Sequence, residues 1–110
     1  MYKPKYLISR EDKTYDIKKI EELSRDIDIE LFKVEDLIWN LEYISKDEDH
    51  DKRVASAFKK TIYPILIHED TEGSLDVLDG LHRLQYAVNK GFGFIYGKLI
   101  PDYMMKQGEI

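Results

Sequence analysis

Five consecutive residues in the carboxyl half of the chain, Asp79-Gly80-Leu81-His82-Arg83, combine side chains that can bind charged groups and move protons. A short apolar run precedes them and a helical pattern follows, which predicts a strand, a tight turn and a helix N-terminus. The amide groups at a helix N-terminus have no partner within the helix and attract anions such as phosphate. Gly80 would let the backbone approach such an anion without a Cβ in the way.

Each charged side chain of this turn has a possible role in binding and a simpler structural one. The planar guanidinium of Arg83 can hold two phosphate oxygens, or it can form a salt bridge with Asp79 or another acid. His82 can donate to a phosphate oxygen or move a proton, or it can bond only to nearby backbone groups. Asp79 can bind magnesium or act as a base towards a hydroxyl group, or it can cap the helix.

Signals for other chemistry are weaker. The acidic run at residues 47–51 could collect a divalent cation, although such runs are more often solvated loops. His50 and Arg53 form a His-x-x-Arg pair, and His68 closes a strand, but ordinary surface placement explains both histidines. The sequence has no zinc-ligand spacing and no Gly-x-x-x-x-Gly-Lys phosphate loop.

The turn must be positioned by a strand before it and a helix after it. Residues 64–67 have the pattern of a buried strand, and residues 75–78 return as its hairpin partner across a polar turn. The helix that begins at Leu81 is predicted to end before Gly91, which is suited to the first position after a helix. A last strand covers residues 92–100, and Pro101 ends it.

The amino half is predicted to supply further helices and strands. Asp16 is the expected N-cap of a helix that carries Ile17, Ile20 and Leu23 on one face. Trp39 lies beside the apolar stripe of a later helix and is expected to pack. The complete order is a strand at 5–8, the helix from Asp16, a half-buried strand at 27–31, a helix at 34–41, a mobile polar loop at 45–52 and a short helix at 53–60.

Composition limits the classes of protein. With 110 residues, 43% of them hydrophobic and 35% charged, the chain is expected to form a single domain over residues 1–103, with residues 104–110 as a frayed tail. The net charge of -5 weighs against nucleic acid as the main partner. No apolar run is long enough to span a bilayer, and no signal peptide is recognisable, so a cytoplasmic location without membrane contact is expected.

The carboxyl half resembles the ParB/sulfiredoxin-like superfamily. The resemblance covers roughly residues 61–101 and rests on the apolar run Tyr63-Pro64-Ile65-Leu66-Ile67, the segment from Asp76 to Leu84 around the turn, and then Ala87 and Gly91. It implies a small α+β fold in which helices pack on a mixed sheet. It also implies that the turn opens a helix that holds nucleotide phosphates.

Carried over to this chain, the resemblance makes Gly80 the glycine of close approach and places Leu81, His82 and Arg83 at the phosphates of a nucleotide. This turn differs in two ways from the turns of known members of the superfamily, and each difference weighs against one of their functions. In sulfiredoxins the residue between Gly and His is the catalytic cysteine. Here that residue is Leu81 and the chain has no cysteine, so reduction of sulfinic acids is excluded. Partition proteins place an acid and a second arginine in the turn; Leu81 and His82 do not reproduce this, which weighs against a CTP-dependent DNA clamp.

These observations leave three functional hypotheses. The first is a nucleotide-binding protein, either a magnesium-dependent phosphotransferase or a nucleotide hydrolase, that uses ATP or CTP with Mg²⁺ and has Asp79 and His82 as catalytic groups. The second is a non-catalytic module of phage or mobile-element origin that binds a protein partner. The third and weakest is a metal-dependent nuclease, against which the acidic charge argues.

Overall fold

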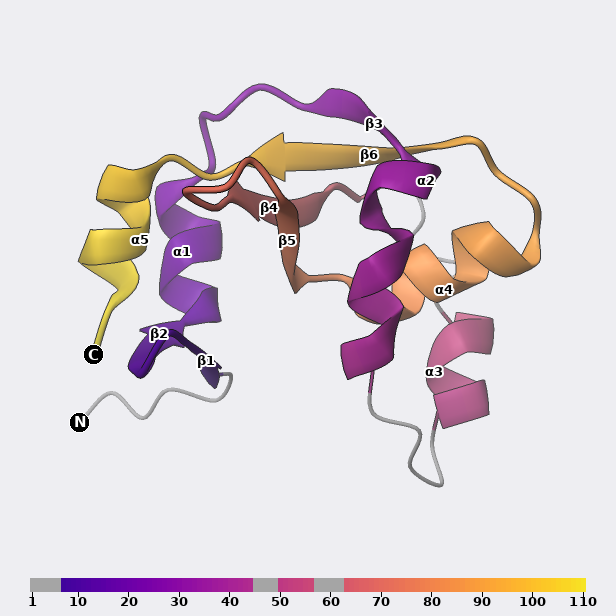
Figure 1. Ribbon diagram of the computed structural model, residues 1–110, viewed down its shortest axis with the longest axis horizontal. Coiled ribbons are helices and arrows are strands. Elements are labelled where there is room, and N and C mark those ends of the chain that lie inside the picture. Colours follow the sequence, from indigo (N-terminus) through magenta and orange to yellow (C-terminus); the bar gives the residue numbers. More distant parts are fainter. Residues whose placement is uncertain (1–6, 45–49, 57–62) are drawn as a thin grey trace.

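A four-stranded mixed sheet organises the fold, with helices on both of its faces (Figure 1). The computed structural model describes residues 7–44, 50–56 and 63–110. The strand order is β3-β6-β4-β5, with β3 at Glu30–Lys33, β6 at Phe94–Leu99, β4 at Ile65–Glu69 and β5 at Leu75–Asp79. β6 runs antiparallel to β3 and parallel to β4, and β4 and β5 form an antiparallel hairpin. The expected α+β class is confirmed.

The hairpin of β4 and β5 sets the position of the candidate turn. Its loop is held by Asp70, whose Oδ1 accepts hydrogen bonds from the backbone amides of Glu72 and Ser74, each at 2.9 Å. Such an Asx turn lets a short loop reverse the chain. β5 therefore returns along β4 and delivers Asp79 opposite Leu66.

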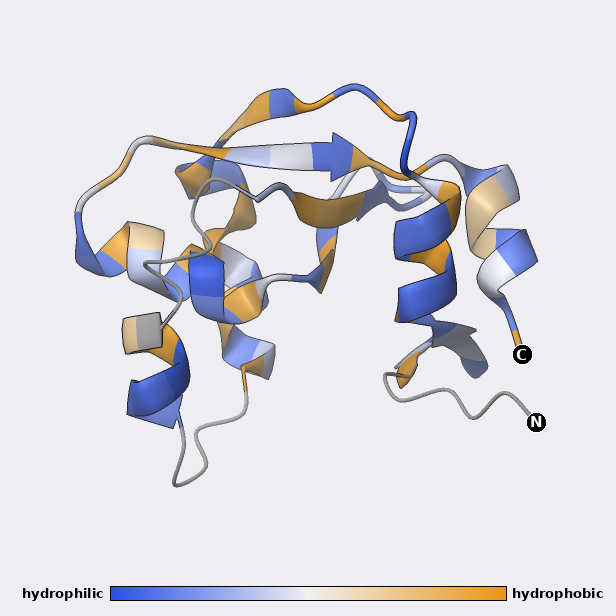
Figure 2. Cartoon of the chain, turned by 180° about the vertical axis from the view of Figure 1, so that it is seen from behind, coloured by the Kyte–Doolittle hydropathy of each residue, from blue (hydrophilic) through white to orange (hydrophobic). Residues whose placement is uncertain are grey.

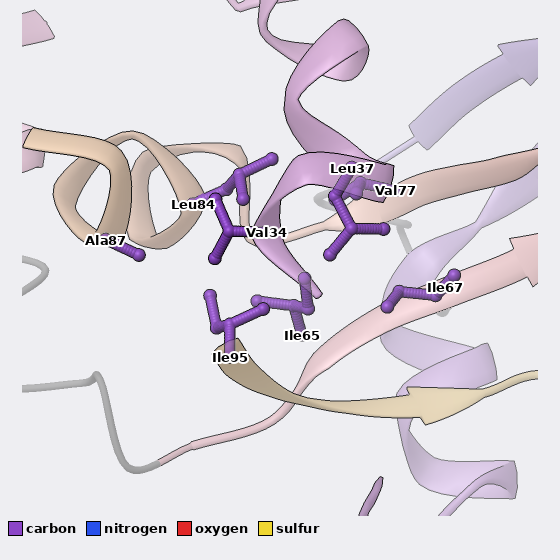
Figure 3. Packing of buried hydrophobic residues seen from close by; sticks show 8 residues of the cluster. All are labelled: Val34, Leu37, Ile65, Ile67, Val77, Leu84, Ala87 and Ile95. Carbon is purple, nitrogen blue, oxygen red and sulfur yellow. The ribbon is translucent and has the colours of Figure 1, made fainter. Parts of the chain in front are cut away.

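One face of the sheet is covered by α2 (Val34–Leu37) and α4 (Leu81–Asn89). Figure 3 shows how apolar side chains from both helices meet those of the sheet. The eight buried members of this cluster are Val34, Leu37, Ile65, Ile67, Val77, Leu84, Ala87 and Ile95. Burial of this apolar surface is the main force that holds α4 against the sheet.

The end of α4 agrees with the prediction from its glycine. Gly91 has a φ of 73°, and its amide donates to Val88 O at 3.0 Å, while the amide of Phe92 donates to Ala87 O at 2.9 Å. This is the Schellman arrangement, which requires the left-handed backbone that glycine adopts without strain.

The opposite face of the hairpin is covered by α1 (Ile17–Leu23) and α5 (Asp102–Gly108), which lie side by side (Figure 1). Asp16 caps α1 as predicted, since its Oδ1 accepts from the amide of Lys19 at 3.2 Å. The outer side of α1 is mostly hydrophilic in Figure 2, and its apolar side packs inward. The buried members of this second cluster are Ile17, Ile20, Leu66, Leu78, Ile100, Met104 and Met105.

The carboxyl end differs from the frayed tail predicted for residues 104–110. α5 occupies most of this segment, and the side chains of Met104 and Met105 are buried against the sheet and α1. The amide of Ile110 also donates to Thr14 O at 2.8 Å. Seven residues are too few for a helical period to stand out in the sequence, and the apolar contacts that stabilise α5 come from distant residues.

A small separate hairpin, β1 (Leu7–Arg10) and β2 (Lys13–Asp16), leads into α1. Its two turn residues, Glu11 and Asp12, have φ values of 50° and 63°. Positive φ at both positions is the type I′ geometry that suits the twist of a hairpin, although glycine or asparagine usually provides it. The predicted first strand at 5–8 starts outside the described residues, and β1 continues to Arg10.

The helix predicted at 34–41 changes geometry halfway. α2 ends at Leu37, and a 3-10 helix, η1 (Ile38–Tyr43), continues it. Buried Asn40 accounts for the change, because it donates to Leu37 O at 2.9 Å and accepts from the amide of Val77 at 2.9 Å. This side chain thereby ties η1 to β5.

Two other segments begin at different positions from those predicted. β3 begins at Glu30, later than the strand expected at 27–31. α3 (His50–Ser56) begins inside the polar loop expected at 45–52, of which residues 45–49 lie outside the described part, as do residues 57–60 of the helix expected at 53–60. None of the helices in the described ranges is long and apolar enough to cross a membrane.

Candidate functional site

The strand, turn and helix predicted around Asp79 are present. β5 ends at Asp79 and α4 begins at Leu81. The backbone amide of Leu84 donates a hydrogen bond to Gly80 O at 2.9 Å, which closes the first turn of the helix. Gly80 has a φ of 110°, and a Cβ at this position would lie 2.8 Å from Cβ of Ile65. Both the backbone conformation and the close approach to β4 therefore require glycine here.

Arg83 fastens the first turn of α4 to the sheet. Its Nη1 donates to the carbonyl oxygens of Tyr63 and Pro64, each at 3.0 Å, and its Nη2 donates to Asp79 Oδ2 at 3.2 Å. The Arg83 side chain is only 15% exposed. These bonds use three of the five N–H donors of a guanidinium, so within the described residues two donors remain for a ligand.

Asp79 is half-buried and belongs to the same pair. Its carboxylate lies beside the guanidinium of Arg83, which is four residues later in the chain, and 27% of the Asp79 side chain is exposed. The alternative that Asp79 caps α4 does not match the geometry, because Gly80 is the N-cap residue and the Asp79 carboxylate bonds to the guanidinium of Arg83 instead. The carboxylate can therefore accept a further contact, for example from a hydrated cation.

Asp79 and Arg83 line one wall of a cavity of about 670 Å³. Arg25, Lys98 and Tyr63 also line it, as do Glu21 and Glu22 of α1. The volume falls within the usual range for small-molecule sites, roughly 300–1,000 Å³. Among the described residues the charged lining is mixed, with three cations and three carboxylates. Such a mixture suits a ligand that carries both anionic groups and a bound metal ion.

Lys98 is anchored at the rim of this cavity. Its Nζ donates to Ser24 O at 2.9 Å and to Arg25 O at 3.3 Å, which connects β6 to the end of α1. An ammonium group has three donors, and these bonds use two of them. The bonds hold the positive charge of Lys98 in place, so a ligand would not need to immobilise it.

The other two side chains of the turn, those of Leu81 and His82, do not line this cavity. Leu81 packs against the apolar cluster beneath α4, so only its backbone amide is available for a ligand. His82 lies near α3, with its ring centroid 5.8 Å from that of His50, and its Nε2 is shielded from solvent. His82 is not among the residues that line the cavity. The structure thus brings Asp79 and Arg83 together, and the phosphate and catalytic roles of His82 stay predictions from the sequence.

Sequence reasoning did not find Arg25, Lys98 or Tyr63. Each lies in a different part of the chain, after α1, in β6 and before β4, and only the fold brings them to one cavity. The sequence around Arg25 and Lys98 carries no motif that distinguishes them from ordinary surface residues, and Tyr63 lies in the apolar run of the resemblance without a charge or motif that would mark a ligand contact. Over the described ranges, no group of three or more His, Asp or Glu residues could hold a metal ion by itself.

Comparison with known proteins identifies the fold. No family model and no curated protein matches the sequence. Among solved structures, the chain is similar to the C-terminally truncated chromosome-partitioning protein ParB from Caulobacter crescentus, crystallised as a complex with CTP-gamma-S. The TM-score is 0.51 with 16% sequence identity, and the match covers 74% of this chain and 50% of that one.

This similarity supports a ParB-like fold, as the resemblance of the turn implied. At 16% identity it establishes the fold alone, and the chain spans about half the length of the ParB chain that it matches.

Proposed function

We propose that this protein binds a nucleoside triphosphate, ATP or CTP, with Mg²⁺ at the cavity beside the first turn of α4. The observation that carries the proposal is Arg83, a nearly buried guanidinium at the cavity wall that, among the described residues, keeps two donors after its bonds to Asp79 and to two carbonyl groups. The similarity of the fold to a ParB complexed with CTP-gamma-S supports the choice of ligand class.

Phosphate oxygens would be held from two sides of the cavity. Arg83 would contribute its remaining N–H groups from α4, while Lys98 and Arg25 would contribute charge from β6 and the segment after α1. Hydrogen bonds between such cations and phosphate are charge-assisted and stronger than neutral ones. The positive end of the nine-residue helix α4 adds to the attraction.

Magnesium would offset the carboxylates of the same cavity. Mg²⁺ usually binds through one or two carboxylates together with the phosphates of its nucleotide, and it keeps several waters. Asp79 would take the carboxylate role, directly or through a water, because it lies beside Arg83 in the wall of the cavity. Without the metal ion, Asp79, Glu21 and Glu22 would repel a triphosphate.

Thermal unfolding with added ligand tests this proposal. A ligand present at about ten times its Kd and bound only to the folded state stabilises it by about 1.4 kcal/mol, which is about 5–10 °C for a domain of this size. We expect ATP or CTP to give this shift with MgCl₂ and a smaller one with EDTA. If neither nucleotide shifts the midpoint under either condition, the proposal is wrong and a protein-interaction module is favoured.

Matched variants locate the binding. Arg25→Gln removes a charge from the cavity, whereas Lys18→Gln removes one from the exposed surface of α1 outside it. We expect Arg25→Gln to weaken nucleotide binding about threefold to tenfold and Lys18→Gln to leave it unchanged. Asp79→Asn should abolish the extra stabilisation that magnesium provides. Equal effects of Arg25→Gln and Lys18→Gln would place the nucleotide elsewhere.

The same mixtures of protein, nucleotide and MgCl₂ also show whether the protein catalyses a reaction of the nucleotide. Phosphate release from ATP or CTP, or phosphate transfer to an acceptor, would extend the proposal from binding to a magnesium-dependent hydrolase or phosphotransferase. Loss of that activity in Asp79→Asn, with binding of the free nucleotide retained, would identify Asp79 as the group that handles the metal ion.

A further inference from the structure

A second cavity, of about 450 Å³, lies away from the turn that begins α4. The hairpin of β1 and β2, the 3-10 helix η1, the loop between β4 and β5, and α5 all contribute to its walls. Within the described part of the chain it shares no lining residue with the proposed nucleotide site. Its chemistry can therefore be considered independently.

Aromatic rings form much of this second cavity. Trp39 and Tyr43, four residues apart on η1, meet edge to face, with ring centroids 6.1 Å apart and planes at 88°. Tyr15 of β2 also lines the cavity. Trp39 is 37% exposed and Tyr43 68% exposed, so the packing that the sequence predicted for Trp39 is incomplete. Two rings at right angles form a corner whose faces are electrostatically negative.

The charged residues of this cavity are mostly carboxylates. Of the residues that the structure describes, Glu11, Asp70 and Asp76 line it, together with one guanidinium, that of Arg10. All three nitrogens of the Arg10 guanidinium form hydrogen bonds within the protein. Its Nε donates to Asp76 Oδ2 at 2.8 Å, and its two Nη atoms donate to the carbonyl groups of Ser9 and Val77. The pair neutralises Arg10 and Asp76, which leaves the negative charges of Glu11 and Asp70.

We propose that this cavity binds an organic cation of the alkylammonium type, with its charged head in the corner of Trp39 and Tyr43. Aromatic faces attract ammonium groups, and the nearby carboxylates of Glu11 and Asp70 add a long-range attraction. The same charges repel nucleotides, so this site is separate from the proposed function. The cation can be a small free alkylammonium ion or the methylated lysine side chain of a peptide, because both carry a positively charged ammonium head group.

Trp39 provides the readout because it is the only tryptophan in the chain. The probe is choline, titrated at constant ionic strength while the emission of Trp39 is recorded. Its control is 3,3-dimethyl-1-butanol, which has the same shape with carbon in place of the charged nitrogen. We expect a saturable change in emission with choline and none with the neutral alcohol over the same concentrations. Excess CTP with Mg²⁺ should not compete.

Variants of the chain provide the second control. Tyr43→Ala removes one wall and should weaken choline binding about threefold to thirtyfold, in line with the usual strength of one cation–π contact. Asp70→Asn should weaken it while preserving the Asx turn, since the amide oxygen can still accept both backbone bonds. Tyr103→Ala changes an exposed tyrosine outside the cavity and should have no effect.

The choline titration and its controls distinguish a cation site from a merely apolar cavity. Equal responses to choline and the neutral alcohol would overturn the proposal, because the cavity would then be merely apolar. No response to choline, or an unchanged affinity in both Tyr43→Ala and Asp70→Asn, would also overturn it. A peptide with trimethyllysine between neutral residues distinguishes the sources. Tighter binding than choline would identify a protein side chain as the ligand, and equal binding a small free alkylammonium ion.

Discussion

Replacement of Gly80 by alanine tests the most constrained position of the candidate site. The new Cβ would lie 2.8 Å from Cβ of Ile65, closer than real Cβ contacts, and Ile65 is fully buried. Overpacking of this kind costs about 1–3 kcal/mol. The φ of 110° adds the strain of a conformation that L-residues rarely adopt, about 1–3 kcal/mol. We therefore expect a loss of about 2–6 kcal/mol in the free energy of unfolding.

Two other glycines separate the two causes. Gly91 has a φ of 73°, and a Cβ added there would meet open space, so Gly91→Ala should cost only the backbone strain, about 1 kcal/mol. Gly93 has neither a positive φ nor a neighbour within 4 Å of an added Cβ, so Gly93→Ala should change stability by less than about 0.5 kcal/mol.

Urea unfolding of the three variants, followed by circular dichroism, provides the free energies. The expected order of destabilisation is Gly80→Ala, then Gly91→Ala, then Gly93→Ala. If Gly80→Ala costs no more than Gly91→Ala, the close approach between the turn and β4 is wrong. A natural domain has about 5–15 kcal/mol of stability, so most of the expected range of losses leaves Gly80→Ala folded in the absence of urea.

Three further predictions concern stability. Asn40→Ala should cost about 2–4 kcal/mol in urea unfolding, because it leaves buried backbone groups of β5 without their partner; a cost below about 1 kcal/mol would contradict this role. Met105→Ala should lower stability by about 2–4 kcal/mol while Tyr103→Ala changes it little, and equal small effects would indicate a frayed end after all. Asp12→Gly should relieve about 1–2 kcal/mol of left-handed backbone strain in the type I′ turn at an entropic cost of about 0.4–1 kcal/mol in the unfolded chain, and so raise the melting temperature slightly; a lower melting temperature would argue against the positive φ.

The parts of the fold that could be predicted depend on local signals. Asp16 as a cap, Gly91 as the residue after a helix, and the strand before Asp79 each follow from a few neighbouring residues. These signals are informative because a helix cap, a left-handed residue after a helix and the apolar pattern of a strand each depend on residues that are close together in the sequence. The turn around Gly80 was found for the same reason.

The parts that were missed depend on long-range contacts. α5 is stabilised by apolar residues of α1 and of the sheet, and the change from α2 to η1 depends on bonds between Asn40 and β5. In the candidate site, Arg25 and Lys98 join Arg83 around one cavity only through the tertiary fold. No window of sequence contains these partners together, so local pattern cannot reveal them.

A titration followed residue by residue tests the proposed nucleotide site most directly. Amide resonances of the ¹⁵N-labelled protein are recorded as CTP, and separately ATP, is added with MgCl₂. We predict that one of these nucleotides shifts the amides of Leu81, His82 and Arg83 most, together with Arg25 and Lys98 across the cavity. If neither nucleotide shifts them, or if the largest shifts occur around Trp39 instead, the assignment of the α4 turn as a phosphate site is contradicted.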